Sequence, residues 1–230
     1  MATNIIYAFV GGILPALVWL IFWLREDRKS PEPRGLILKT FLLGMGGVLL
    51  IALVALIFEK EASRIVDNMA LPAIILLASI EEGLKFLAGY FGGIRSVEDN
   101  EPVDPLIYMI TAALGFVALE NTLFILGPMI DGNVLESLVT GHMRFIGASL
   151  LHIVSSGFVG MALAFSFYKS LPRKFITTIL GLMVAIAFHT FFNIVILTFK
   201  GSGATLSAIA VWTGVIFLLW AFERAKAIAR

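Results

Sequence analysis

Long apolar segments, separated by short charged or glycine-containing breaks, follow one another along the whole chain. A transmembrane helix requires about 20 predominantly apolar residues, and seven segments reach that length. They cover residues 4–24, 35–58, 70–92, 104–126, 142–168, 174–199 and 204–222. The pattern therefore predicts an all-α polytopic membrane protein, with about seven transmembrane helices in one bundle and a single domain over residues 1–230.

The composition supports lipid as the solvent for most of the chain. Hydrophobic residues make up 59% of the sequence and charged residues only 14%, which leaves too little polar surface for a water-soluble globule. Cysteine is absent, so disulfides, a thiolate nucleophile and a cysteine-type zinc site are excluded. No basic tract predicts a nucleic-acid partner. The first apolar segment has no basic residues before it, which favours a transmembrane helix over a cleavable signal peptide.

The charged breaks predict the orientation, because Lys and Arg concentrate in cytoplasmic loops. One set of alternate loops, together with the C-terminal tail, carries most of these residues: Arg25, Arg28, Lys29, Arg34, Lys169, Arg173, Lys174, Arg224, Lys226 and Arg230. The other set holds only Lys60, Arg64 and Lys200. We therefore expect a multi-pass protein of the cell membrane with its N-terminus outside and its C-terminus in the cytoplasm.

Several polar residues fall inside the predicted spans, where an ionisable group costs several kcal/mol and indicates a functional site. They come from the third to the sixth span: Glu81, Glu82, Glu120, Asn121, His152, His189 and Asn193. At about 1.5 Å per residue from the predicted outer helix ends, the depths are roughly 15–18 Å for Glu81, His152 and His189, and roughly 9 Å for Glu120 and Asn193. We therefore expect four helices to bring these groups into one cavity in the outer half of the membrane.

The spacing of these residues predicts some of their contacts. Glu81 and Lys85 are four residues apart and can pair on one helix face, as can His189 and Asn193. Adjacent Glu81 and Glu82 diverge by about 100° on a helix, so one points at the shared centre and the other orients it.

Some polar residues also have plainer interpretations. A helix–helix hydrogen bond explains Asn121 equally well. An interfacial position is favoured for His142 and Arg144 near a helix end, although Arg144 can also support the site.

Several of these residues, with their spacing, resemble the motifs of the PrsW family. Glu81, Glu82 and Lys85 match its EExxK motif, and Phe116, Glu120 and Asn121 match its FxxxE-N motif. The later histidines, the Glu32-Pro33 pair and Asp104 are also similar, and His189 with Asn193 fits an HxxxN-type motif better than His152 does. The resemblance implies an intramembrane endopeptidase of the glutamic type, distantly similar to the CAAX prenyl endopeptidases, that makes the first cut in a single-span substrate such as an anti-sigma factor.

Peptide hydrolysis needs an activated water, a proton for the leaving amine and donors for the oxyanion. We expect Glu81, helped by His152 or Glu120, to activate water, and His189 with Asn193 to stabilise the oxyanion. Glu82 is expected to orient the site with Lys85 or Arg144, although the sequence leaves open which glutamate is the base. The expected cut lies near the outer side of the bilayer.

Three alternatives remain. A zinc ion held by Glu81, Glu120, His152 and His189 would make the protein a metalloprotease, although the version without a cofactor is preferred because no HExxH motif is present. Intramembrane Glu and His residues also serve as proton relays in transporters, but no inverted repeat is visible. A scaffold without catalysis would carry these buried charges at a high cost.

Overall fold

The protein is described here by a computed structural model that covers residues 2–57, 71–199 and 202–228. Basic residues used above to predict the orientation, namely Lys60, Arg64, Lys200 and Arg230, lie outside the described residues.

Helices account for nearly all of the described chain, and each predicted span corresponds to one of them. The elements are α1 (Ala2–Leu24), the short 3-10 turn η1 (Arg25–Asp27), α2 (Arg34–Ile57), α4 (Leu71–Gly89), the π-helical turn η2 (Tyr90–Ile94), α5 (Asp104–Ile130), α6 (Val134–Phe165), α7 (Leu171–Thr198) and α8 (Ser202–Lys226). The described residues contain no strand. The prediction of an all-α polytopic membrane protein is confirmed.

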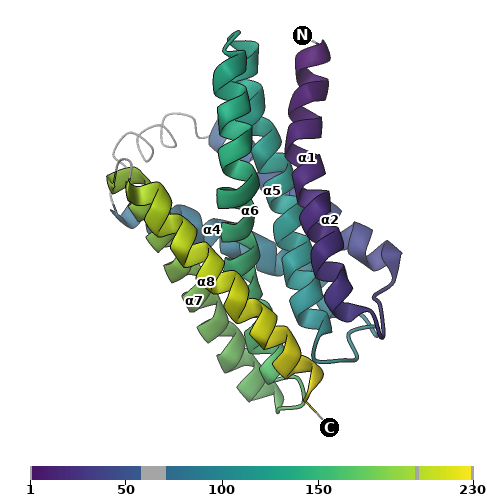
Figure 1. The fold of residues 1–230 in the computed structure, drawn as a ribbon. Helices are drawn as coiled ribbons and strands as arrows, with labels where there is room; N and C mark the ends of the chain where they lie inside the picture. Colours follow the sequence, from purple (N-terminus) through teal and green to yellow (C-terminus); the bar gives the residue numbers. More distant parts are fainter. Residues whose placement is uncertain (1, 58–70, 200–201, 229–230) are drawn as a thin grey trace.

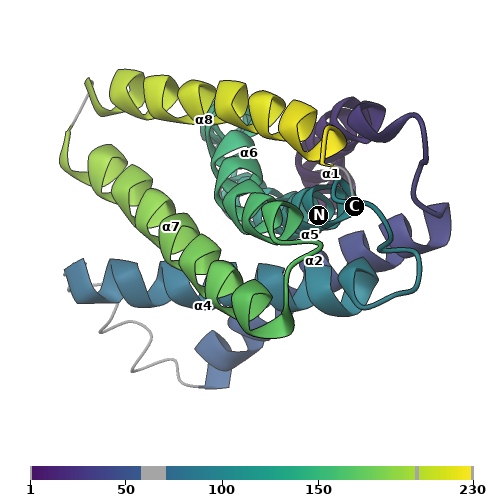
Figure 2. The ribbon, with the colours of Figure 1, turned by 90° about the horizontal axis from the view of Figure 1, so that it is seen from below.

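Six of the described helices are long and apolar enough to cross a membrane. The exception is α4, which carries Glu81, Glu82 and Lys85 within its 19 residues. Its direction also differs from that of α1, α5 and α6: Figure 2 looks along these three helices, whereas α4 is seen lengthwise, as are α7 and α8. The helix that carries Glu81, Glu82 and Lys85 therefore lies across α1, α5 and α6, and it contacts α2, α5, α6 and α7.

The hairpin of α5 and α6 is taller than predicted, and this changes the depth argument. The predicted boundaries at 126 and 142 are wrong, because α5 continues to Ile130 and α6 begins at Val134 after a turn in which Gly132 has φ 83°. From these ends, at about 1.5 Å per residue, Glu120 lies about 15 Å and His152 about 27 Å along its helix. The predicted depths of Glu120 and His152 were both too small, and the groups come together because inclined helices cross one another (Figure 1).

Helix α5 is the centre of the bundle and fixes the position of the site. Every residue of α5 from Asp104 to Leu119 is buried. Glycines allow a close approach of α2, because a side chain at Gly115 would meet the Phe41 carbonyl oxygen at 1.9 Å and one at Gly44 would meet that of Ala112 at 2.1 Å. This close packing sets the register of α5, and with it the position of the polar residues on its next turn.

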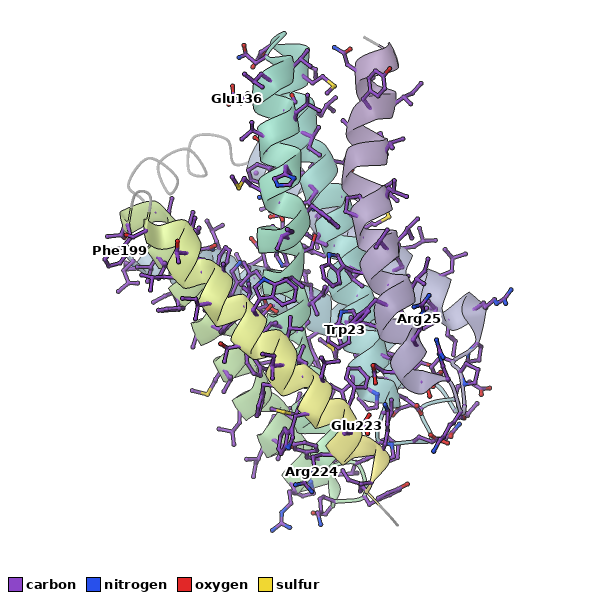
Figure 3. The ribbon with its side chains drawn as sticks, in the orientation of Figure 1. Trp23, Arg25, Glu136, Phe199, Glu223 and Arg224 are labelled. Atoms are coloured by element: carbon purple, nitrogen blue, oxygen red, sulfur yellow. The ribbon has the colours of Figure 1, made fainter. Side chains whose placement is uncertain are left out.

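The basic segments gather at one end of the molecule. The N- and C-termini lie at opposite ends (Figure 1), and Arg25 and Arg224 lie toward the C-terminal end, whereas Glu136 lies at the other (Figure 3). The Lys226 ammonium lies 2.7 Å from Glu26 Oε2, which joins the end of α8 to η1. We call this the basic end. It contains the loops over residues 25–34 and 169–174 and the end of α8, which the sequence assigned to one side of the membrane.

Candidate active site

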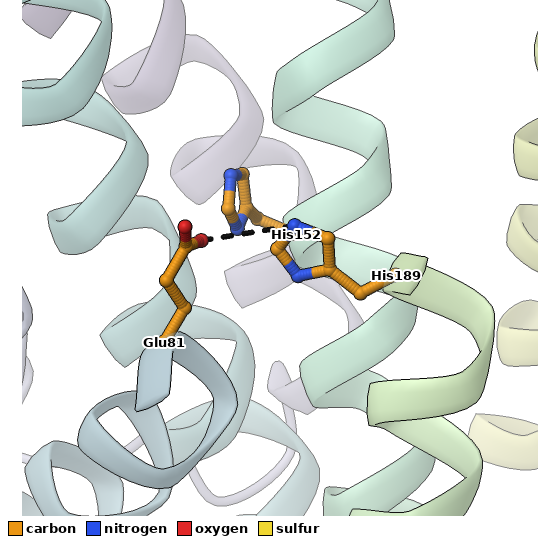
Figure 4. Close-up of side chains that lie close together, drawn as sticks. All are labelled: Glu81, His152 and His189. Carbon is orange, nitrogen blue, oxygen red and sulfur yellow. Dashed lines mark ion pairs between the residues drawn. The ribbon is translucent and has the colours of Figure 1, made fainter. Parts of the chain in front are cut away.

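The structure brings together most of the ionisable residues predicted inside the spans. Helix α4 contributes Glu81 and Glu82, α5 contributes Glu120, α6 contributes His152 and α7 contributes His189. One ligand atom from each of Glu81, His152 and His189 lies within 4.8 Å of the other two, and Figure 4 shows these three side chains converging from three helices. The sequence therefore predicted correctly that four helices bring these groups to one centre.

Glu82 is the innermost carboxylate of the cluster, and its side chain is only 1% exposed. Its Oε1 accepts hydrogen bonds from Lys85 Nζ at 2.6 Å and from Ser155 Oγ at 2.9 Å. The same oxygen lies 2.7 Å from His189 Nδ1, and Ser156 Oγ donates to Oε2 at 3.3 Å. With four donors around it, Glu82 is held as an ionised carboxylate that orients its neighbours.

Lys85 connects Glu82 to His152. Its side chain is fully buried, its ammonium lies 2.7 Å from His152 Nδ1, and the same ammonium lies 5.2 Å from the Phe116 ring centre. The predicted pairing of Glu81 with Lys85 is wrong, because Lys85 pairs with Glu82 instead. Residues three apart also share a helix face, and this face is the one that meets α6.

The rim of the cluster is formed by Glu120 and Arg144. Arg144 Nη2 donates to Glu120 Oε2, and Arg144 Nε donates to Asn121 Oδ1 at 2.7 Å. The Glu120 and Arg144 side chains are each 19% exposed, and Glu120 Oε2 also lies 3.2 Å from His152 Nε2. Arg144 therefore holds Glu120 beside His152, in agreement with the alternative that it supports the site, whereas His142 is exposed.

Glu81 differs from the other carboxylates because one of its oxygens is not used. Glu81 Oε2 is buried and makes no hydrogen bond to any described residue. It lies 3.7 Å from His189 Nε2, which is too long for a direct hydrogen bond. The Glu81 side chain as a whole is 19% exposed, although its Oε2 atom is buried, so the pair lies just beneath an exposed part of the cluster.

The residues around this gap fit a zinc ion. Two imidazoles and one carboxylate are a common ligand set for catalytic zinc with an open position, and Glu82 holds the second ring nitrogen of His189, as carboxylates often do for zinc-bound histidines. Glu120, a ligand in the predicted set of four, is engaged by Arg144 instead. For His152 to bind through Nε2, its Nδ1 must carry the proton, and the Lys85 ammonium must then stop donating to Nδ1.

Two further features of the site differ from expectation. Asn193, predicted as an oxyanion donor, is half-buried one turn beyond His189, and among the described residues it makes no hydrogen bond with the cluster. Ser155 and Ser156, which hold Glu82, were not predicted. Their only sequence signal is that they lie three and four residues after His152 on the same helix, and serine is common in membrane helices.

Two residues of the family resemblance lie away from the cluster. Asp104 is 16 residues before Glu120 on α5, which is about 24 Å along the helix. Glu32 accepts a hydrogen bond from the Tyr108 hydroxyl. Burial raises the pKa of Glu32 to about 8, against the lowering effect of that hydrogen bond. Both residues belong to the basic end and take no part in the central cluster.

A multi-pass membrane bundle with two imidazoles, three carboxylates and an unused carboxylate oxygen near its centre has the features of an intramembrane hydrolase. The family model described as PrsW family intramembrane metalloprotease matches residues 32–221, so this chain belongs to the PrsW family. The match confirms the predicted family, and with it that the chain is a peptidase.

Curated relatives agree with this assignment, and each is called Protease PrsW. The one from Geobacillus kaustophilus is 29% identical over 137 residues, which span 59% of this chain and 60% of the relative. The one from Oceanobacillus iheyensis is 28% identical over 212 residues, or 91% and 89% of the two chains. That from Halalkalibacterium halodurans is 24% identical over 192 residues, or 81% and 82%. No solved structure matches the chain.

Proposed function

We propose that this chain hydrolyses a peptide bond of a membrane-protein substrate, with Glu81, His152 and His189 as its reaction centre. The observation that carries the proposal is the gap of 3.7 Å between Glu81 Oε2 and His189 Nε2, beside a cluster whose other charges are paired. A water molecule in this gap meets a carboxylate oxygen that has no other partner. Such a carboxylate can orient the water and accept its proton.

The version that we favour has a zinc ion held by Glu81, His152 and His189. It is supported by the three converging ligand atoms and by the description of the family as metalloproteases. A bound zinc ion supplies a Lewis acid that lowers the pKa of a bound water to about 7 and polarises the scissile carbonyl. In this version Glu82 fixes the ring of His189 by accepting its Nδ1 hydrogen.

Proton transfer is assigned to Glu120 in this version. When the water oxygen bonds to the carbonyl carbon, the carboxylate of Glu120 accepts one water proton. When the carbon–nitrogen bond breaks, the same proton passes to the leaving amine. Arg144 keeps Glu120 ionised and at the rim, where its Oε2 lies 3.2 Å from His152 Nε2.

A version without metal is the second candidate, and one contact favours it. The Lys85 ammonium donates to His152 Nδ1, which leaves the ring hydrogen on Nε2 and removes the lone pair that a metal ion needs. Glu81 is then the base. Glu82 is excluded from that role because four donors already occupy its oxygens. His189 can remain the oxyanion donor only as an imidazolium, with its Nδ1 hydrogen on Glu82 and its Nε2 hydrogen on the oxyanion.

The direction of the rim suggests where the substrate is cut. Along α6, Arg144 lies about two turns closer to the α5–α6 turn than His152 does, so the exposed members of the cluster face away from the basic end. With the basic loops in the cytoplasm, the N-terminus is outside and the rim opens outward. The scissile bond then lies in an unwound stretch near the outer end of a substrate helix, as in site-1-type cleavage of a single-span anti-sigma factor.

The test uses the purified chain in lipid vesicles with a panel of single-span proteins, and mass spectrometry of the fragments. We expect one cut near the outer end of the substrate span, which disappears in Glu81→Gln and persists in Glu136→Gln, a carboxylate exposed on α6. Cleavage that survives Glu81→Gln, or a cut at the cytoplasmic end, would refute the proposal. Loss of activity on chelation and its return with zinc decide between the two versions.

A further inference from the structure

A second group of carboxylates lies at the basic end, away from the central cluster. Asp27 ends η1, Glu101 lies in the loop before α5, and Asp104 is the first residue of α5. One carboxylate oxygen from each of the three lies within 4.8 Å of the other two. Two segments that are distant in sequence, the end of η1 and the start of α5 with the loop before it, therefore direct acidic side chains at one point.

Two oxygens of this group are buried without a partner. Asp27 Oδ2 and Asp104 Oδ1 make no hydrogen bond to a described residue, and their residues are only 5% and 1% exposed. The other oxygen of Asp104 accepts the backbone N–H groups of Asn100 and Glu101, at 2.8 and 2.7 Å. The side chain of Asp104 is therefore held in place while its second oxygen remains available.

No cation of the protein neutralises this group within the described ranges. None of the three carboxylates forms an ion pair there, although basic side chains are close. Lys226 directs its ammonium to Glu26 and Glu223, at 2.7 Å each. Like-charged carboxylates at this separation cannot all remain ionised unless a positive charge is added, and a buried charge without a partner is costly.

We propose that Asp27, Glu101 and Asp104 bind a hard divalent cation, Mg²⁺ or Ca²⁺, which joins the end of α1 to the start of α5. An all-oxygen donor set is the set that these ions prefer, and the absence of imidazole distinguishes it from the central cluster. A cavity of about 480 Å³, lined in part by Asp27 and Glu101, provides space for the water molecules that complete their coordination. The site does not depend on the proposed protease mechanism.

The test measures thermal unfolding of the full chain in detergent, first in chelator and then with Mg²⁺ or Ca²⁺ alone. We expect saturating cation to raise the Tm of the wild type by about 2–4 °C, and the ion with the lower midpoint concentration to be the better ligand. Asp27→Asn and Asp104→Asn should lose this shift. In chelator they should be as stable as the wild type or more stable, because each removes one of the repelling charges.

Two control variants separate this site from other carboxylates. Glu223→Gln alters a 71% exposed carboxylate at the same end and should keep the shift, as should Glu81→Gln in the central cluster. Equilibrium dialysis should find one Mg²⁺ or Ca²⁺ per chain in the wild type and none in Asp104→Asn. No shift in the wild type, or an equal shift and equal binding in Asp104→Asn, would overturn the proposal.

Discussion

In the central cluster each buried charge faces an opposite charge or a hydrogen-bond donor, whereas the three carboxylates at the basic end face one another. Glu82 has Lys85 at 2.6 Å, and Glu120 has Arg144. Asp27 and Asp104 have no such partner among the described residues. Both groups are buried, but only one of them is neutralised by the protein's own side chains.

This difference separates two uses of buried acids. In the central cluster most charges are paired, and Glu81 Oε2, a buried oxygen without a hydrogen bond among the described residues, is where the proposed water or metal ion would be bound. At the basic end two carboxylate oxygens have no partner among the described residues, which supports the proposed cation site and a structural role. The predictions below test whether the two clusters respond to substitution in these different ways.

The largest effect is expected for Glu81→Gln. The amide keeps the shape of the side chain, but in the zinc version it is a poorer metal ligand than a carboxylate. In the version without metal it cannot accept a proton, and general-base catalysis contributes about 10²- to 10⁴-fold. We therefore expect cleavage to fall by at least about 100-fold while the Tm stays close to that of the wild type. A fragment assay and a thermal melt on the same preparation measure both. If Glu136→Gln lost as much activity, the effect would not be specific to the cluster.

Glu82→Gln should act mainly on stability. Removing the carboxylate charge leaves the Lys85 ammonium buried without its partner, and breaking a buried ion pair costs about 3–5 kcal/mol. We expect a large drop in Tm, and partial recovery of the Tm in the double variant Glu82→Gln/Lys85→Met, in which neither charge remains. The activity of the double variant should stay low, because His189 has lost its orienting partner. If Glu82→Gln were as stable as the wild type, the Glu82 carboxylate would not be the partner that neutralises the buried Lys85 ammonium.

Arg144→Lys should have a smaller effect, confined to activity. A lysine keeps the positive charge but cannot donate to Glu120 and Asn121 at the same time from one planar group. We expect cleavage to fall by about 10-fold, with a Tm shift of less than about 2 °C because the rim is partly exposed. The fragment assay measures this on Arg144→Lys beside a control, Arg95→Lys, which changes an exposed arginine outside the cluster. A drop of 1,000-fold would place Arg144 in the reaction itself.

The sequence predicted the helices and most of the cluster because both rest on strong local signals. Apolar segments of membrane length define the spans, and ionisable residues within them are costly enough to mark a site. Helix tilt leaves no such signal, so the steep crossing of α4 was not predicted, and the depth count that assumed parallel helices failed. The end of α5 was predicted too early. The apolar pattern continues past Pro128, and the helix continues with it.

The pairing within the cluster was predictable only in part. Spacing alone allows Lys85 to reach either Glu81 or Glu82, and the choice depends on His152, which lies 67 residues further along the chain. The acidic group at the basic end was also beyond reach of the sequence. Its three members lie in different loops and helix ends, and no spacing rule relates Asp27 to Asp104.

The smallest effect is expected for Tyr108→Phe at the basic end. The Tyr108 hydroxyl donates to Glu32, and its removal leaves a carboxylate oxygen buried without that donor. A buried hydrogen-bond group that loses its partner costs about 1–3 kcal/mol, so the Tm should fall by a few degrees. Tyr90→Phe, which changes a 40% exposed tyrosine on η2, should leave the Tm unchanged.

Activity of Tyr108→Phe at temperatures well below its Tm should equal that of the wild type. Glu32 belongs to the basic end and contacts none of Glu81, His152 or His189 among the described hydrogen bonds. A thermal melt and the fragment assay, both on folded protein, separate stability from catalysis. A Tyr108→Phe protein that is folded but inactive would show that the basic end takes part in the reaction, and that the two acidic regions are one functional unit.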